Sequence, residues 1–168
     1  MLRKLEEKDA PHMLEWMHDE TINCFFRFDA ANMTYEKALD YIVKANEAED
    51  ELHFAIVDEA DEYMGTISLK NIDKINRKAE YAISTRSCAH GKGVAMKATE
   101  EILGIAFKEL ELNKVYLNVL SVNERAVRFY EKAGFSYEGE FVQDILIRNE
   151  FYNLKWYGML AAEYGLKK

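Results

Sequence analysis

Near the middle of the chain stands the segment His90-Gly91-Lys92-Gly93-Val94-Ala95, between an expected strand and an expected long helix. At a helix N-terminus, unpaired backbone N–H groups and the positive end of the macrodipole converge, and glycine lets an anion approach the main chain closely. The segment therefore predicts a phosphate-binding turn. Taken by itself, it also fits a plain glycine-rich turn with a solvated Lys92.

Two common phosphate-binding motifs are absent from the sequence. There is no G-x-x-x-x-G-K-[ST], and there is no G-x-G-x-x-G because Met96 and Lys97 stand three and four residues after Gly93. The sequence therefore disfavours a nucleoside triphosphatase and a dinucleotide-dependent dehydrogenase.

The patterns on both sides of the glycine segment predict a crossover unit. Strands are expected at Ala79 to Thr85 and at Val115 to Leu120, and apolar residues recur at helical spacing from about Val94 to Leu110. Further strands at Leu52 to Val57 and Tyr63 to Leu69 predict an antiparallel meander that leads into this unit.

The two ends of the chain add helices and strands around this centre. A short strand from Leu2 to Leu5 precedes two helices with Asp9 and Thr34 as expected N-caps. After the centre, a helix closed by Gly134 leads to two strands, near Tyr137 to Ile147 and Phe151 to Leu160. The order β-α-α-β-β-β-α-β-α-β-β predicts an α/β (α+β) fold, a mixed sheet with helices on both faces.

Composition limits the classes of protein to which the chain can belong. With 168 residues and 49% hydrophobic residues, one domain over residues 1–168 is expected, and the net charge of −8 disfavours nucleic-acid and anionic membrane partners. No signal peptide or membrane-length apolar run is visible. Cys24 and Cys88 lie far apart and the histidines are scattered, so we expect a cytoplasmic protein with no metal.

A second informative segment is Asn123-Glu124-Arg125-Ala126-Val127-Arg128-Phe129-Tyr130-Glu131-Lys132-Ala133-Gly134-Phe135. Its helical spacing places Ala126, Phe129 and Tyr130 on one face, and Gly134 is suited to a left-handed cap before the next strand. Without further context, Tyr130 is expected to be a core tyrosine.

Together, the two segments resemble the signatures of the GNAT superfamily of N-acetyltransferases. The first is similar to Gln/Arg-x-x-Gly-x-Gly/Ala, with His90 at the position of Gln or Arg, and the second to Asn-x-x-Ala-x-x-x-Tyr-x-x-x-Gly-Phe. The resemblance covers nearly the whole chain and is strongest to the branch of ribosomal-protein N-terminal and spermidine acetyltransferases. It implies a sheet of about seven strands that splays between its two central parallel strands.

The resemblance implies acetyl-CoA as co-substrate and assigns it a site. The pantetheine arm would pair with Ile83, Ser84 and Thr85, while Asn123 and Tyr130 approach the pantetheine and the thioester. The pyrophosphate would rest on a continuous stretch of main chain formed by His90, Gly91, Lys92, Gly93, Val94, Ala95 and Met96.

The implied reaction is direct attack of a primary amine on the thioester in a ternary complex, with Tyr130 donating to the departing sulfur. Glu80 is the candidate base, and a structural ion pair with a nearby Lys or Arg is the alternative for its carboxylate. Direct transfer needs no protein thiol, so Cys24 and Cys88 have no role in it. A catalytically silent acetyl-CoA-binding or regulatory domain is the competing function.

The acceptor is open between a polyamine, a peptide or protein N-terminus and an amino sugar or antibiotic. The aromatic connector Phe25 to Phe28 and the C-terminal hairpin are expected to flank the acceptor site. Its candidate residues are Phe26, Arg27, Glu138 and Tyr152. A homodimer is possible, because dimers are common in this branch.

Overall fold

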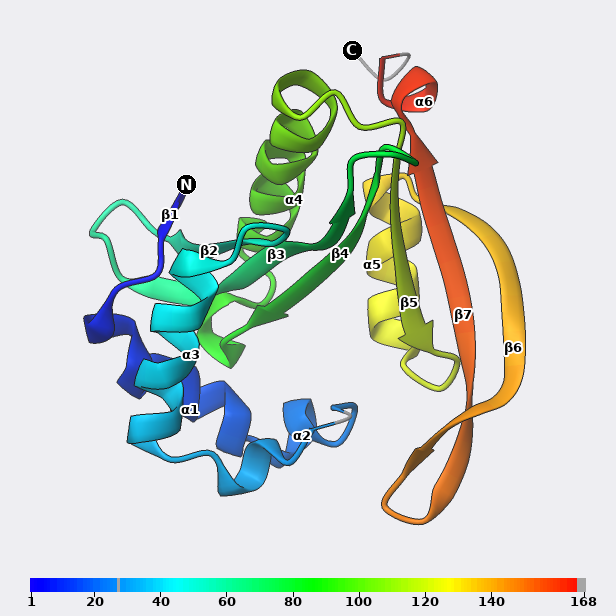
Figure 1. Cartoon of the computed structure of the whole chain (residues 1–168). Coiled ribbons are helices and arrows are strands. Elements are labelled where there is room, and N and C mark those ends of the chain that lie inside the picture. Colours follow the sequence, from blue (N-terminus) through cyan, green and yellow to red (C-terminus); the bar gives the residue numbers. More distant parts are fainter. Residues whose placement is uncertain (27, 166–168) are drawn as a thin grey trace.

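The computed structural model describes residues 1–26 and 28–165. Its α-helices and strands follow the predicted order, with one extra short α-helix early and one late (Figure 1). The strands are β1 (Leu2–Lys4), β2 (Leu52–Val57), β3 (Tyr63–Asp73), β4 (Lys78–Thr85), β5 (Lys114–Leu120), β6 (Ser136–Ile147) and β7 (Glu150–Leu160). The α-helices are α1 (Ala10–His18), α2 (Glu20–Asn23), α3 (Tyr35–Glu47), α4 (Val94–Gly104), α5 (Glu124–Ala133) and α6 (Ala161–Gly165).

All seven strands belong to one mixed sheet with the order β1-β2-β3-β4-β5-β7-β6. Neighbouring strands are antiparallel except β4 and β5, which are parallel and are connected in sequence through α4. This confirms the predicted meander, the crossover unit and the mixed α/β fold.

Two apolar cores lie on opposite faces of the sheet. Ala55 and Ile56 are adjacent in β2 and both fully buried, yet Ala55 packs with α1 and α3 while Ile56 packs in the core under α4. Side chains alternate between the two faces of a strand, so a strand covered on both faces buries consecutive residues. The helices therefore cover both faces, as predicted.

The two central parallel strands diverge toward their C-terminal ends. β4 pairs with β5 only from Lys78 to Glu80, opposite Lys114 to Tyr116. Beyond this point β4 continues to pair with β3 as far as Thr85, and β5 pairs with β7 as far as Leu120 (Figure 1). The sheet thus opens between β4 and β5, which confirms the expected splay.

Several helix ends follow the predicted capping residues. The Thr34 hydroxyl accepts a hydrogen bond from the Lys37 backbone N–H at 3.4 Å, and Gly134 ends α5 with φ +95°. The long helix is regular from Val94 only to Gly104, because the next turn, Ile105–Glu109, has the wider π-helical hydrogen bonding.

Asp9 is the N-cap residue of α1, as predicted, but its side chain makes no capping hydrogen bond to that helix. Asp9 is 1% exposed, and its carboxylate accepts two hydrogen bonds from the Arg3 guanidinium, both at 2.8 Å. It also accepts from the Glu6 backbone N–H. Leaving a buried carboxylate unpaired costs more free energy than leaving a helix without a side-chain cap. The Asp9 carboxylate therefore links β1 to the turn before α1.

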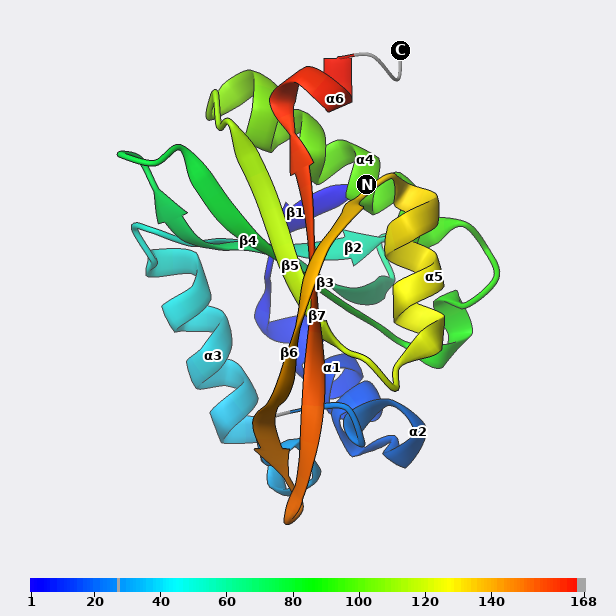
Figure 2. The same cartoon turned by 90° about the vertical axis from the view of Figure 1, so that its right-hand side faces the viewer.

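The β6–β7 hairpin extends past the sheet and brings its turn close to α2 (Figures 1 and 2). Arg148 in that turn donates a hydrogen bond to the Asn23 side chain at 3.1 Å, and Phe25 packs against the apolar cluster of Leu120, Ile147 and Leu154. Within the described residues, no helix combines the length and the apolar character needed to cross a membrane.

Candidate active site

The glycine segment forms the turn between β4 and α4. Gly91 and Gly93 both have φ +75°, and Gly93 is the N-cap residue of α4. A Cβ atom added at either glycine would meet no atom within 4 Å, so backbone conformation rather than lack of space requires glycine there. The turn thus presents the start of α4 to open space, as a phosphate-binding turn must.

Arg86 holds the beginning of this turn in place. Its guanidinium donates to Glu15 of α1 at 2.6 Å, to Glu62 at 2.7 Å and to the Tyr63 carbonyl oxygen at 2.7 Å. The Arg86 backbone N–H also donates to the Met64 carbonyl oxygen. These contacts join α1, β3 and the segment before β3 at the point where β4 ends, so they hold the start of the turn in place.

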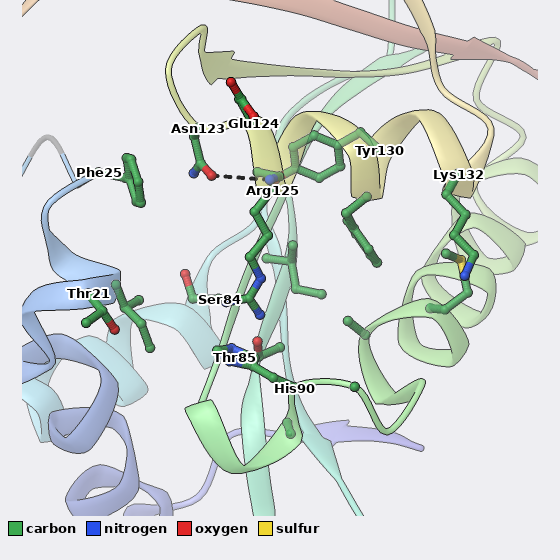
Figure 3. Close-up of a pocket in the computed structure, with 18 of the residues that line it drawn as sticks. Thr21, Phe25, Ser84, Thr85, His90, Asn123, Glu124, Arg125, Tyr130 and Lys132 are labelled. Carbon is green, nitrogen blue, oxygen red and sulfur yellow. Dashed lines mark hydrogen bonds between the residues drawn. The ribbon is translucent and has the colours of Figure 1, made fainter.

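A cleft of about 800 Å³ lies between the turn, the end of β4, α5 and the segment around α2 (Figure 3). Ten of the twelve predicted cofactor residues line it, and Lys92 and Val94 do not. The ten are Ile83, Ser84, Thr85, His90, Gly91, Gly93, Ala95, Met96, Asn123 and Tyr130. The end of β4 with the glycine turn and the start of α5, which are far apart in sequence, thus meet at one cavity.

Asn123 starts α5 at the rim of this cleft. Its side-chain oxygen accepts a hydrogen bond from the Ala126 backbone N–H at 3.2 Å (Figure 3). The cap satisfies one of the free N–H groups of the first turn and fixes the direction of the helix. It also sets which helix face, that of Ala126, Phe129 and Tyr130, lines the cleft.

Tyr130 is buried on three sides by aromatic rings and lines the cleft. It is 9% exposed and lies against Tyr81, Phe129 and Phe135, with ring centroids 5.5 to 6.2 Å away. Burial raises the pKa of Tyr130 to about 12. No residue in the described part of the chain forms a hydrogen bond with its hydroxyl, so a protonated phenol is held here without a protein partner.

His90 replaces the Gln or Arg of the family signature at the start of the turn. Burial, and then the positive charge of Arg125, lower the pKa of His90 below its ordinary value. The imidazole is therefore neutral near pH 7 and adds no positive charge to the turn.

Glu80, the predicted base, is not among the residues that line the cleft. It pairs opposite Tyr116, where β4 and β5 are still joined. Its carboxylate accepts a hydrogen bond from the Asn71 side chain at 3.0 Å and lies 3.5 Å from the Lys70 ammonium nitrogen. The structural ion pair, which was the alternative for this residue, is the arrangement seen.

Of the candidate acceptor residues that the structure describes, only one lines the cleft. Phe26 lines the cleft, whereas Arg27 lies outside the described residues. Glu138 forms an ion pair with Lys114 at 2.6 Å, and the Tyr152 hydroxyl donates to Glu150 at 2.7 Å. Neither Glu138 nor Tyr152 lines the cleft.

Phe25, at the start of the aromatic connector that was expected to flank the acceptor site, lines the cleft. Other residues that line it were not assigned a role from the sequence, among them Thr21, Ile22, Arg125 and Lys132. Arg125 occupies one of the variable positions of the Asn-x-x-Ala signature, so the motif gives no indication of its role. The available signal was a cation in the first turn of a helix, where the macrodipole disfavours positive charge.

Comparison with known proteins agrees with this geometry. The acetyltransferase (GNAT) domain family matches residues 1–136. A spermidine N(1)-acetyltransferase of Vibrio cholerae is 28% identical over 97% of this chain and 94% of its own length. A putative ribosomal N-acetyltransferase of Bacillus subtilis is 34% identical over 62% of this chain and 57% of its own length.

A solved structure extends the similarity to the fold. The crystal structure of spermidine N-acetyltransferase from Vibrio cholerae in complex with CoA and spermine matches with a TM-score of 0.88 at 27% identity, covering 98% of this chain and 96% of that one. Sequence motifs, splayed sheet, cleft and relatives all lead to one assignment. The chain belongs to the GNAT family of acetyltransferases.

Proposed function

We propose that this protein transfers the acetyl group of acetyl-CoA to a primary amine of a small molecule, by direct attack within a ternary complex. The observation that supports this most strongly is that one cleft is lined both by the glycine turn and by Tyr130, whose hydroxyl has no protein partner in the described chain. The turn suits a phosphate group, and the phenol suits a group that gains negative charge as it leaves.

The residues that line the cleft fit acetyl-CoA. Backbone N–H groups between Gly91 and Met96, at the positive end of α4, would hold the pyrophosphate. Ile83 to Thr85 lie beyond the last pairing with β5, so this edge of β4 is available to an extended pantetheine arm. Asn123 lies across the cleft from that edge (Figure 3).

Acetyl-CoA supplies the acetyl group as a reactive thioester. Because the pKa of Tyr130 is about 12 and that of a free thiol is about 8.5, the phenol holds its proton more tightly than the departing sulfur would. Tyr130 therefore stabilises the negative charge on that sulfur by donating a hydrogen bond, without giving up its proton in the ground state.

The ammonium form of the acceptor must lose a proton before attack. Glu80 is bound to Lys70 and Asn71 away from the cleft, and the cleft residue Glu124 pairs with Arg128 at 3.0 Å. We therefore assign proton removal to water. On this basis kcat/KM rises with pH toward the amine's pKa of ~10, because the neutral amine is the nucleophile.

A panel of amines tests the proposal, with CoA release and product mass as readouts. Spermidine comes first because full-length relatives acetylate it, followed by an amino sugar and a peptide with a free N-terminus. We expect acetylation of at least one small amine, with Gly93→Glu as the inactive control. Tight acetyl-CoA binding without acetylation of any amine would support the silent binding domain instead.

We further infer one functional domain over residues 1–168 and a cytoplasmic location. The second inference is supported by the two thiols, since Cys24 and Cys88 are both free in the structure, as a reducing compartment would keep them.

A further inference from the structure

The cleft contains a positive charge that neither the signature motifs nor the proposed chemistry accounts for. The chain has a net charge of −8, yet two permanent cations, Arg125 and Lys132, line this cavity. The carboxylate that lines it with them, Glu124, is paired with Arg128 on the outer surface of α5.

Arg125 lies where positive charge is unfavourable unless an anion is near. It is the second residue of α5, in the first turn, where the helix macrodipole disfavours a cation. Among the residues that the structure describes, no carboxylate lies within ion-pair distance of its guanidinium. An anion that binds in the cleft would therefore give the Arg125 guanidinium a partner and relieve its unfavourable interaction with the macrodipole.

The side chain of Arg125 extends toward the beginning of the glycine turn. Figure 3 shows it reaching from α5 across the cleft toward Thr85 and His90, whereas Lys132 lies at the other end of the same helix. The charge of Arg125 is close enough to act on the His90 imidazole. Arg125 therefore faces the same part of the turn as the first residue of the signature.

We propose that Arg125 binds the pyrophosphate of acetyl-CoA, supplying from α5 a cationic side chain beside the turn, whose own cation Lys92 does not line the cleft. This inference rests on the proposed function. Arginine suits the role because its planar guanidinium makes paired hydrogen bonds to phosphate oxygens and keeps its charge at every relevant pH. The pyrophosphate would then be held by main-chain N–H groups from α4 on one side and by Arg125 on the other.

The test measures the Kd of acetyl-CoA by isothermal titration calorimetry for wild type, Arg125→Gln and Arg125→Lys. We expect Arg125→Gln to raise Kd by about tenfold or more and Arg125→Lys to raise it less, because lysine keeps the charge but loses the paired geometry. Arg128→Gln is the matched control, since it lies on the same helix with its charge directed at Glu124, and should change Kd by less than about twofold. Thermal unfolding confirms that each variant is folded.

Two truncated donors identify the group that Arg125 contacts. With acetyl-dephospho-CoA, which keeps the pyrophosphate and lacks the 3′-phosphate, the Arg125→Gln penalty should persist. With S-acetylpantetheine, which has no phosphate group, wild type and Arg125→Gln should have equal kcat/KM.

Three results would overturn the inference: an unchanged Kd in Arg125→Gln, a penalty that vanishes with acetyl-dephospho-CoA, or a raised KM for the amine with unchanged Kd for acetyl-CoA. The last would assign Arg125 to the acceptor. If wild type itself fails to bind acetyl-CoA, the proposed function fails with it, so the two failures are distinguishable.

Discussion

The two sides of the cleft are built in different ways. The proposed cofactor side consists of a turn with two left-handed glycines, a capped helix start at Asn123 and a tyrosine packed among aromatic rings. The proposed acceptor side consists of short segments around α2 that contact a distant hairpin. Asn23 accepts a hydrogen bond from Arg148, and Phe25 packs against the cluster of Leu120, Ile147 and Leu154. Backbone geometry fixes the first side, and side-chain contacts between remote segments fix the second. Substitutions on the two sides should therefore change different quantities, acetyl-CoA binding and turnover on the first side and the KM for the amine on the second.

The largest effect is expected on the cofactor side, from Gly93→Glu. A side chain at φ +75° strains the backbone, and the new carboxylate adds negative charge beside the pyrophosphate. We expect the Kd for acetyl-CoA to rise by about a hundredfold, which titration calorimetry can measure. Gly139→Glu, at a glycine of β6 with open space around it, is the control. A folded Gly93→Glu protein with wild-type affinity would show that the turn does not bind the co-substrate.

The next effect is expected from Tyr130→Phe, which keeps the ring packing and removes the hydroxyl. We expect kcat to fall by at least about tenfold with little change in acetyl-CoA affinity, because the lost hydrogen bond forms mainly in the transition state. Turnover at the wild-type rate under conditions in which chemistry limits would make Tyr130 a packing residue.

The pH dependence of the effect of Tyr130→Phe on kcat tests the environment of Tyr130. The pKa of the phenol is raised above its ordinary value, so its protonated form persists through pH ~10 and is lost only as pH approaches about 12. The ratio of wild-type to Tyr130→Phe kcat should stay constant from about pH 7 to pH 10. A ratio that falls toward one within that interval would mean that the hydroxyl ionises normally.

On the acceptor side, Phe25→Ala should have a smaller and more selective effect. Phe25 lines the cleft and packs against the hairpin, so its loss should raise the KM for the amine by about threefold to tenfold and leave the Kd for acetyl-CoA unchanged. Phe141→Ala, at an exposed site on β6, is the matched control. A changed Kd for acetyl-CoA would show that the two sides of the cleft are not independent.

The smallest effects are expected from substitutions at residues that have no role in the proposed reaction. Glu80→Gln should change kcat/KM by less than about twofold at each pH, because its carboxylate is bound to Lys70 and Asn71 outside the cleft. Cys88→Ala should likewise retain turnover, because direct transfer requires no thiol. A flattened pH profile in Glu80→Gln would restore its role as base.

Most of the cofactor side could be predicted from the sequence because it depends on local features. Gly91, Gly93 and Gly134 occupy positions that require left-handed backbone, and such requirements are visible as motifs. The prediction that Glu80 faces the cleft was wrong, because it rested on strand alternation alone. Alternation along a strand gives the face but not the distance, and Glu80 lies four residues, about 13 Å, before Ser84. Thr21 and Ile22 line the cleft through the tertiary packing of the α2 segment, which no local sequence pattern indicates. The only local signal for Arg125 was a cation in the first turn of a helix.

The most direct test of this account is amide hydrogen exchange measured with and without acetyl-CoA, in the absence of any amine. We predict slower exchange in residues 83–96 and 122–132, where the co-substrate would contact the main chain, and unchanged exchange in the hairpin turn around Arg148. Protection confined to the hairpin and the α2 segment, or no protection at saturating acetyl-CoA, would contradict the assignment of the cleft.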